Sequence, residues 1–131
     1  MGILDSLKSF TQMGGQYHSL WNLPQSTREI DALFSDTENA HAIYKHSNRC
    51  GISFIAQNSL ESGIDKLQDT LRFHLIDVVT NRSLSAYISE KTGIRHESPQ
   101  LILLYHGEVY WYASHGRVRI DALKDAAGEL T

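Results

Sequence analysis

Residues 41–60 read HAIYKHSNRCGISFIAQNSL, and within them the pattern changes from that of a strand to that of a helix. The segment 41–45 predicts a short strand. Ser47 and Asn48 are favoured N-cap residues, so we expect a helix to begin after them. The expected buried positions of this helix are Ile52, Ile55, Ala56 and Leu60. The single cysteine, Cys50, therefore falls where a strand passes into a helix.

The rest of the chain continues this alternation of strands and helices. Residues 71–79 and 100–105 predict two more strands, and a tight turn at 106–108 leads into a return strand at 109–113. The remaining helices are expected after Ser26 or Thr27, from Arg82 to a stop at Gly93, and over residues 119–127.

This order predicts an α/β fold with a central mixed β-sheet. The strands near 41–46 and 71–79 are joined through a helix, which implies a right-handed crossover and parallel strands, whereas the hairpin of 100–105 and 108–114 adds antiparallel ones. Helices then cover both faces of the sheet. In such sheets the reactive site lies beyond the carboxyl edge of the parallel strands, which is where Cys50 is expected.

Length and charge exclude several classes of protein. The chain has 131 residues, a formal net charge of -3 and 41% hydrophobic residues, which fits one soluble domain and argues against a dedicated nucleic-acid binder. No apolar run approaches the ~20 residues of a membrane span, and the first residues lack the pattern of a secretory signal. One cysteine excludes an intramolecular disulfide. We therefore expect a cytoplasmic protein that binds neither nucleic acid nor membrane.

The first residues differ from the rest. Ile3, Leu4, Leu7 and Phe10 have helical spacing, and Gly14-Gly15 would end such a helix. The first six residues also match the loose pattern for N-myristoylation, but a short amphipathic helix explains them more simply. We expect residues 1–15 to form an amphipathic helical appendage and residues 16–131 to form a single domain.

The surroundings of Cys50 favour a reactive thiol. A thiol reacts as its thiolate, and a free cysteine with a pKa near 8.5 is only about 3% ionised at pH 7. The positive end of a helix favours the thiolate by about 0.3–1 kcal/mol, which is less than one pKa unit. Arg49 beside the sulfur and the hydroxyl of Ser53 are candidates for the remaining stabilisation. The alternative is a buried, inert cysteine.

The seven histidines do not predict a metal site. They are scattered along the chain without the close pairs or cysteine partners of a zinc site. His46 is the exception of interest, because it precedes Cys50 by four residues and could orient or protonate a substrate.

Four blocks of sequence resemble the monothiol bacilliredoxin family, whose members have a thioredoxin fold and use bacillithiol as their low-molecular-weight thiol. The blocks are Lys45-His46-Ser47-Asn48-Arg49-Cys50-Gly51-Ile52-Ser53, Arg82-Ser83-Leu84-Ser85, His96-Glu97-Ser98-Pro99-Gln100, and Trp111 with Ser114-His115. The resemblance covers about residues 21–121. The chain departs from it at Gly51, where proline is usual, and at Asn48, where threonine is common.

The resemblance implies a thioredoxin-like three-layer α/β/α sandwich and a site around Cys50. It implies that Ser98-Pro99 is a cis peptide bond facing the cysteine, where residue 98 can pair with an extended substrate segment. Ser98, Pro99, Gln100 and His46 are then the expected substrate-binding residues, and Cys50, Arg49 and Ser53 the catalytic ones.

The activity implied is that of a thiol-disulfide oxidoreductase that removes bacillithiol from client proteins. Ser53 occupies the position of a resolving cysteine, so a second thiol or a reductase must regenerate Cys50. Bacillithiol is then a co-substrate, no cofactor is tightly bound, and the partners are bacillithiolated client proteins.

Two other functions compete with this one. Cys50-Gly51-Ile52-Ser53 is similar to the Cys-Gly-Phe-Ser signature of monothiol glutaredoxins, which implies an iron–sulfur cluster carrier in which two chains and two thiol molecules supply four ligands. A non-catalytic, thioredoxin-like stress-response binding module is the third possibility.

Overall fold

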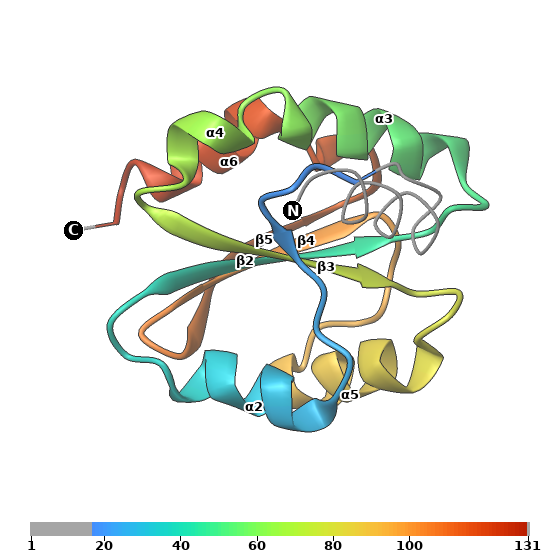
Figure 1. The fold of residues 1–131 in the computed structure, drawn as a ribbon, viewed down its shortest axis with the longest axis horizontal. Coiled ribbons are helices and arrows are strands. Elements are labelled where there is room, and N and C mark those ends of the chain that lie inside the picture. Colours follow the sequence, from blue (N-terminus) through green and yellow to red (C-terminus); the bar gives the residue numbers. More distant parts are fainter. Residues whose placement is uncertain (1–16, 131) are drawn as a thin grey trace, which may run out of the picture.

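A five-stranded sheet lies between two layers of helices in the computed structural model, which describes residues 17–130 (Figure 1). The strands are β1 (Trp21–Asn22), β2 (Ala40–His46), β3 (Leu71–Asp77), β4 (Gln100–Tyr105) and β5 (Glu108–Ser114). The helices are α2 (Thr27–Ser35), α3 (Gly51–Glu61), α4 (Ile64–Leu67), α5 (Arg82–Thr92) and α6 (Ile120–Ala127), with a 3-10 turn at His115–Arg117.

The sheet is mixed, as the sequence predicts. Its strand order is β1-β3-β2-β4-β5. β2 pairs with β3 in parallel, so that His46 lies opposite Asp77 at their carboxyl ends. β4 is antiparallel to β2, and β5 returns antiparallel to β4 as a hairpin. The predicted strand–helix–strand unit and the predicted hairpin are both confirmed.

Each face of the sheet carries its own apolar core. Alternation along β2 sends Tyr44 into the core under α3 and α6, and Ile43 into the core under α2 and α5. Both side chains are fully buried. Burying one Leu, Ile or Phe side chain contributes roughly 1.5–3 kcal/mol, so the two cores hold the sheet between its helices and fix the edge where β2 and β3 end.

The helix ends of the second core follow the predicted signals. Ser26 is the N-cap of α2, and its hydroxyl accepts a hydrogen bond from the amide of Glu29 at 3.3 Å. α5 ends at Gly93, whose φ of 75° is in the left-handed region that glycine adopts most easily. These two caps place the helices that line the lower face in Figure 1.

The predicted start of α3 is wrong, and of its four expected buried positions Ala56 and Leu60 are confirmed while Ile52 and Ile55 are wrong. The N-cap is Cys50 itself, not Ser47 or Asn48. The buried positions are Ser53, Ala56, Gln57 and Leu60, whereas Ile52 and Ile55 are 48% and 70% exposed. The buried set has the spacing of one helical face, and two of its members are polar residues that bond within the protein. Hydrophobicity alone therefore placed Ile52 and Ile55 in the core, where Ser53 and Gln57 lie instead.

Smaller differences appear at element boundaries. The two-residue strand β1 was not predicted, because two residues are too short to show a periodicity. α3 ends at Glu61 and α4 begins after Gly63, where an added Cβ would lie 2.6 Å from a side-chain carbon of Ile120. The glycine therefore permits the close approach of α6.

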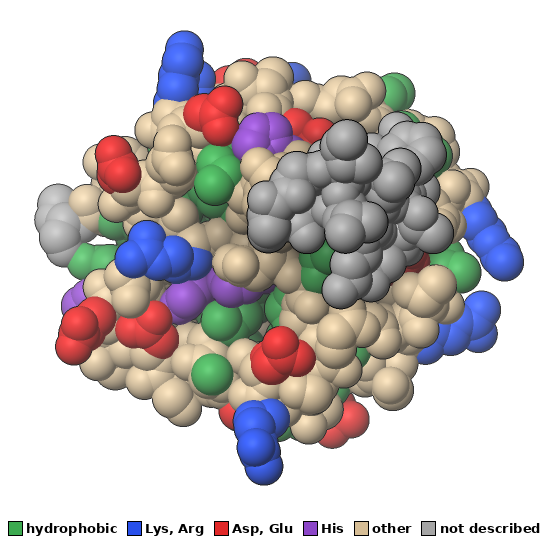
Figure 2. Space-filling model, in the orientation of Figure 1, with side chains coloured by type: hydrophobic (Ala, Val, Ile, Leu, Met, Phe, Trp, Pro, Cys, Tyr) green, Lys and Arg blue, Asp and Glu red, His purple; other side chains and the backbone are tan. Residues whose placement is uncertain are grey.

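Some predictions fall on residues outside the described range. The expected amphipathic helix of residues 1–15 and its N-myristoylation pattern lie there, so the boundary between appendage and domain stays a prediction. Among the helices formed by residues 17–130, none is both long and apolar enough to cross a membrane. On the face shown in Figure 2, acidic and basic side chains are interspersed rather than gathered into one patch.

Candidate functional site

The loop between β2 and α3 holds Cys50 at the carboxyl edge of the parallel strands, at the right of Figure 1. The amide of Cys50 donates to the carbonyl of Ser47 at 3.2 Å, and the amide of Arg49 donates to the Ser47 hydroxyl at 3.3 Å. The amide of Ser47 in turn donates to the Ser53 hydroxyl at 3.2 Å. These bonds fix a tight turn that presents the cysteine at the start of the helix.

The Cys50 thiol is partly exposed and its pKa is lowered from the ordinary value. The backbone amide of Ser53 contributes most to this shift, and the amide of Ile52 and the hydroxyl of Ser53 add to it, while partial burial acts in the opposite direction. Amides at a helix start carry the positive end of the helix dipole and stabilise an anion, and the Ser53 amide also donates to the Cys50 carbonyl at 3.1 Å. The site therefore favours a thiolate that solvent and a disulfide can reach.

Of the two residues expected to lower this pKa, Ser53 has the direct contact. Its side chain is fully buried, and its hydroxyl bonds both to the loop before the cysteine and to the thiol. The Arg49 side chain is exposed to solvent, where its charge is screened. Its role beside the thiol stays a prediction.

His46 supports the first turn of α3 through Tyr44. The Tyr44 phenol donates to the carbonyl of Ser53 at 2.8 Å and lies 2.9 Å from His46 Nδ1. Because a phenol has only one proton, His46 Nδ1 must be the donor in the second bond. Burial lowers the pKa of His46, which keeps the ring neutral. Its Nε2 is buried and has no hydrogen-bond partner among residues 17–130.

The Ser98-Pro99 peptide bond is cis, as the family resemblance implies. The carbonyl of Pro99 accepts a hydrogen bond from the amide of His115 at 2.8 Å, which joins this loop to the turn after β5. The side-chain amide of buried Gln100 donates to the carbonyl of Arg95 at 3.0 Å and to the Ser114 hydroxyl at 3.1 Å. Pro99 and Gln100 are buried and Ser98 is half-buried, so the predicted substrate contacts of this loop remain predictions.

Two residues of the site were missed from the sequence. Tyr44 was read only as a strand residue, although it connects His46 to α3. Asp77 ends β3, and its carboxylate accepts from the amide of Val79 at 2.9 Å and from the Asn48 side chain at 3.4 Å. Its place at the carboxyl end of a parallel strand was the signal that could have found it.

Apolar side chains surround the exposed start of α3. Ile52 and Ile55 are exposed, and Phe54 is 43% exposed while its ring contacts His46. These three residues, the α3 apolar patch, lie within the five positions that follow Cys50. An apolar surface beside a reactive group suits contact with a protein substrate.

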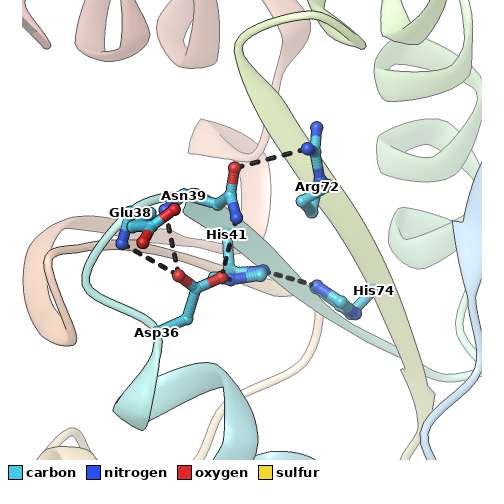
Figure 3. A network of polar contacts seen from close by, with 6 residues as sticks. All are labelled: Asp36, Glu38, Asn39, His41, Arg72 and His74. Atoms are coloured by element: carbon cyan, nitrogen blue, oxygen red, sulfur yellow. Dashed lines mark hydrogen bonds and ion pairs between the residues drawn. The ribbon is translucent and has the colours of Figure 1, made fainter.

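A second polar cluster joins the loop before β2 to the side chains of β2 and β3 (Figure 3). His41 Nε2 is 2.8 Å from Asp36 Oδ2, and His41 Nδ1 is 2.9 Å from His74 Nε2. Two histidines that looked scattered in the sequence are therefore neighbours, because β2 and β3 pair in parallel. No group of three or more His, Cys, Asp or Glu residues within 17–130 is placed to hold a metal ion.

Comparisons with known proteins agree with the fold. Residues 23–123 match the family model described as "Monothiol bacilliredoxin BrxC". A candidate oxidoreductase with a thioredoxin fold is 26% identical, with a TM-score of 0.75, over 82% of this chain and 94% of that one. A thioredoxin mutant from Halobacterium salinarum is 24% identical, with a TM-score of 0.64, over 83% of this chain and 88% of that one.

Mitochondrial thioredoxin 3 from Saccharomyces cerevisiae gives the same fold at lower identity. It is 18% identical, with a TM-score of 0.67, over 86% of this chain and 97% of that one. The chain thus has a thioredoxin fold, with a central mixed sheet in a three-layer α/β/α arrangement. The matched family and this fold support a redox-type function.

Proposed function

The chain belongs to the monothiol bacilliredoxin family, and on that premise we propose that it is a monothiol thiol-disulfide oxidoreductase that removes bacillithiol from protein mixed disulfides through Cys50. The observation that carries the proposal is the position of the only cysteine in the chain. Cys50 is the N-cap of α3, partly exposed, and its thiol pKa is lowered by the amides of Ser53 and Ile52 and the Ser53 hydroxyl.

The first step is an exchange of one disulfide for another. The Cys50 thiolate attacks the bacillithiol sulfur of the mixed disulfide, the bond between that sulfur and the client sulfur breaks, and the client leaves as a thiolate. A new disulfide now joins Cys50 to bacillithiol. No net oxidation occurs, because one disulfide and one thiolate are present before and after the step.

Regeneration of Cys50 needs a second thiol. Ser53 stands where a resolving cysteine would stand, so the chain cannot close an internal disulfide. The thiolate of another bacillithiol molecule, or of a reductase, attacks the bacillithiol sulfur and displaces the Cys50 thiolate. With bacillithiol the second product is its symmetric disulfide. The protein then acts with bacillithiol as co-substrate and without a tightly bound cofactor.

The surroundings of Cys50 support contact with a protein client. The α3 apolar patch exposes Ile52, Phe54 and Ile55 directly after the cysteine. Ser98 is half-buried in the cis-proline loop, where its backbone is a candidate to pair with an extended client segment. Such chemistry requires a reducing compartment, so we expect the protein to work in the cytoplasm.

The proposal is tested by release of a client thiol. A client protein carrying one bacillithiol mixed disulfide is mixed with reduced protein, and the free client thiol is titrated with time. Wild type releases the thiol, whereas Cys50→Ser does not, because a serine hydroxyl stays protonated near neutral pH. Equal release by wild type and Cys50→Ser would overturn the proposal.

A further inference from the structure

A cavity of about 590 Å³ lies between α5, the end of β3 and the cis-proline loop. Val78 and Val79 form one wall, and His96 closes the side toward the cis-proline loop. The third wall is one face of α5, from Arg82 to Glu90. This volume is in the range of about 300–1,000 Å³ that is usual for small-molecule sites. Two of the four sequence blocks that resemble the family line this cavity, one through Arg82 and Ser85 and the other through His96, yet the exchange at Cys50 uses none of these residues.

Lys45 lies buried against Ser85, Ser89 and His96, which line this cavity, and His96 Nδ1 is also 3.0 Å from the Ser85 hydroxyl. Its ammonium donates to the carbonyl of Ser85 at 3.1 Å, to the Ser89 hydroxyl at 3.0 Å and to His96 Nδ1 at 3.3 Å. An ammonium can only donate, so His96 Nδ1 is an acceptor and Nε2 carries the ring proton. Within the described chain Nε2 has no hydrogen-bond partner. His96 is therefore a neutral donor at the cavity wall.

The charges around the cavity match a ligand that carries both carboxylate and amine. Arg82 and buried Lys45 supply two positive charges, and Glu90 supplies one negative charge. Neither Arg82 nor Glu90 makes an ion pair or hydrogen bond through its side chain with another of residues 17–130. Both side chains are thus available to bind a ligand. Val78, Val79 and Ala86 offer apolar contact.

The cavity shares the edge of the sheet that holds Cys50. The amide of Val78 donates to the carbonyl of His46 at 2.9 Å, which ties the wall of the cavity to the strand that leads to the cysteine. His96 precedes the cis Ser98-Pro99 bond by two residues. In Figure 1 the ends of β2 and β3 lie at the right, with the start of α3 above the sheet and the start of α5 below it.

Resting on the proposed function, we propose that this cavity, the α5 cavity, holds the carboxylate-bearing portion of the low-molecular-weight thiol whose sulfur is exchanged at Cys50. Bacillithiol has this chemistry, with carboxylates on its malate portion and a free amine on its cysteinyl portion. Arg82 and the Nε2–H of His96 then bind the carboxylates, and Glu90 binds the amine. Lys45 acts as a positioning residue that holds His96 in its donor tautomer.

The test separates binding from exchange by use of S-methyl bacillithiol, which cannot form a disulfide. Titration into the ¹⁵N-labelled full chain should shift the amides of Val78, Val79, Ser85 and Ala86. Arg82→Gln and His96→Ala should each weaken binding about five- to tenfold, because each removes a hydrogen bond to a carboxylate. Arg117→Gln is the matched control, because Arg117 lines a different cavity with Tyr112 and His115, and it should bind as wild type does.

Several results would overturn the assignment. Shifts concentrated at residues 112–117, or a loss of binding in Arg117→Gln but not in Arg82→Gln, would place the ligand in the other cavity. Absence of binding by S-methyl bacillithiol while bacillithiol transfer to Cys50 proceeds would reject the α5 cavity and leave the proposed function standing. Binding at the α5 cavity without transfer to Cys50 would reject the proposed function and leave the cavity standing.

Discussion

The hydroxyl of Ser53 accepts a hydrogen bond from the backbone amide of Ser47 at 3.2 Å, which ties the first turn of α3 to the end of β2. The same hydroxyl lowers the pKa of the Cys50 thiol. One buried side chain therefore positions the cysteine and also stabilises its thiolate. Ser53 therefore has a structural and an electrostatic role, although it occupies the position of a resolving cysteine.

Ser53→Ala should raise the pKa of Cys50 and weaken the fold. Loss of the hydrogen bond to the thiolate should slow alkylation about two- to tenfold near pH 6.5, where the thiolate fraction limits the rate. The unpaired amide of Ser47 should reduce the free energy of unfolding by about 1–3 kcal/mol. Alkylation rates against pH and urea unfolding measure the two effects.

Arg49→Ala is the matched comparison for this variant. It should slow alkylation in the same direction but less, because the Arg49 side chain is exposed and its charge is screened. A larger effect in Arg49→Ala than in Ser53→Ala would contradict the assignment of the pKa shift to the helix start.

Gly51→Pro should stabilise the protein. Gly51 is the first residue of α3, where proline is favoured, and a Cβ placed there meets no atom within 4 Å. Cys50 before it has φ -122° and ψ 121°, a conformation that a following proline accepts. We expect the free energy of unfolding to rise by about 0.4–1 kcal/mol, because the unfolded chain loses freedom. Urea unfolding measures it, and a decrease would show that the start of the helix differs from this geometry.

The sequence predicted those elements of the fold that depend on local patterns, and it failed where burial depends on side-chain hydrogen bonds. The hairpin, the strand–helix–strand unit and the stop at Gly93 rest on local patterns that no tertiary contact reversed. The face of α3 was predicted only in part, because Ser53 and Gln57 are buried through hydrogen bonds that hydrophobicity does not show. The burial of a polar residue depends on the hydrogen-bond partners that its side chain reaches in the folded chain, here the Ser47 amide and the Glu61 carboxylate.

The sequence predicted only part of the site, because some of its contacts join residues that are far apart in the chain. Cys50 at a helix start and the cis Ser98-Pro99 bond followed from a local pattern and a family resemblance. The burial of Lys45 under α5 could not be predicted, because its three acceptors lie 40 to 51 residues away in sequence. The proximity of His41 and His74 likewise depends on strand register.

Stability should fall as the pH is lowered from 7 to 5. Burial, together with the neighbouring His41, lowers the pKa of His74 to about 3. The unfolded chain protonates this residue near pH 6.5 while the folded chain does not, so acid favours the unfolded state between these two values. The free energy of unfolding should decrease by up to about 1.4 kcal/mol per pH unit for this group. Urea unfolding at pH 7, 6 and 5 measures the slope.

The His74→Gln variant tests whether His74 causes this dependence of the free energy of unfolding on pH. His74→Gln should lower the number of protons taken up on unfolding by about one, since glutamine does not titrate. The free energy of unfolding then depends less steeply on pH. The lowered pKa of His46 acts in the same direction and should leave a smaller residual slope. Stability that rises on acidification over this range would contradict the buried neutral state of His74.

His96 should show a fixed ring tautomer. The contact between Lys45 and His96 Nδ1 requires the proton on Nε2, and burial together with the Lys45 charge lowers the pKa of His96. Ring ¹⁵N shifts at pH 7 should therefore report the Nε2–H form. Lys45→Met should mix the tautomers and raise the pKa of His96, whereas Arg82→Gln should leave the tautomer unchanged. A mixed tautomer in wild type would contradict the positioning role of Lys45.

The central claim is that Cys50 accepts bacillithiol from a mixed disulfide. Its most direct test is the intact mass of the protein after a single turnover with an equimolar bacillithiolated client. We expect wild type to gain the mass of one bacillithiol less two hydrogens, one from the bacillithiol thiol and one from Cys50, and we expect added bacillithiol to remove this mass. A wild-type mass that stays unchanged while the client keeps its bacillithiol would contradict the account.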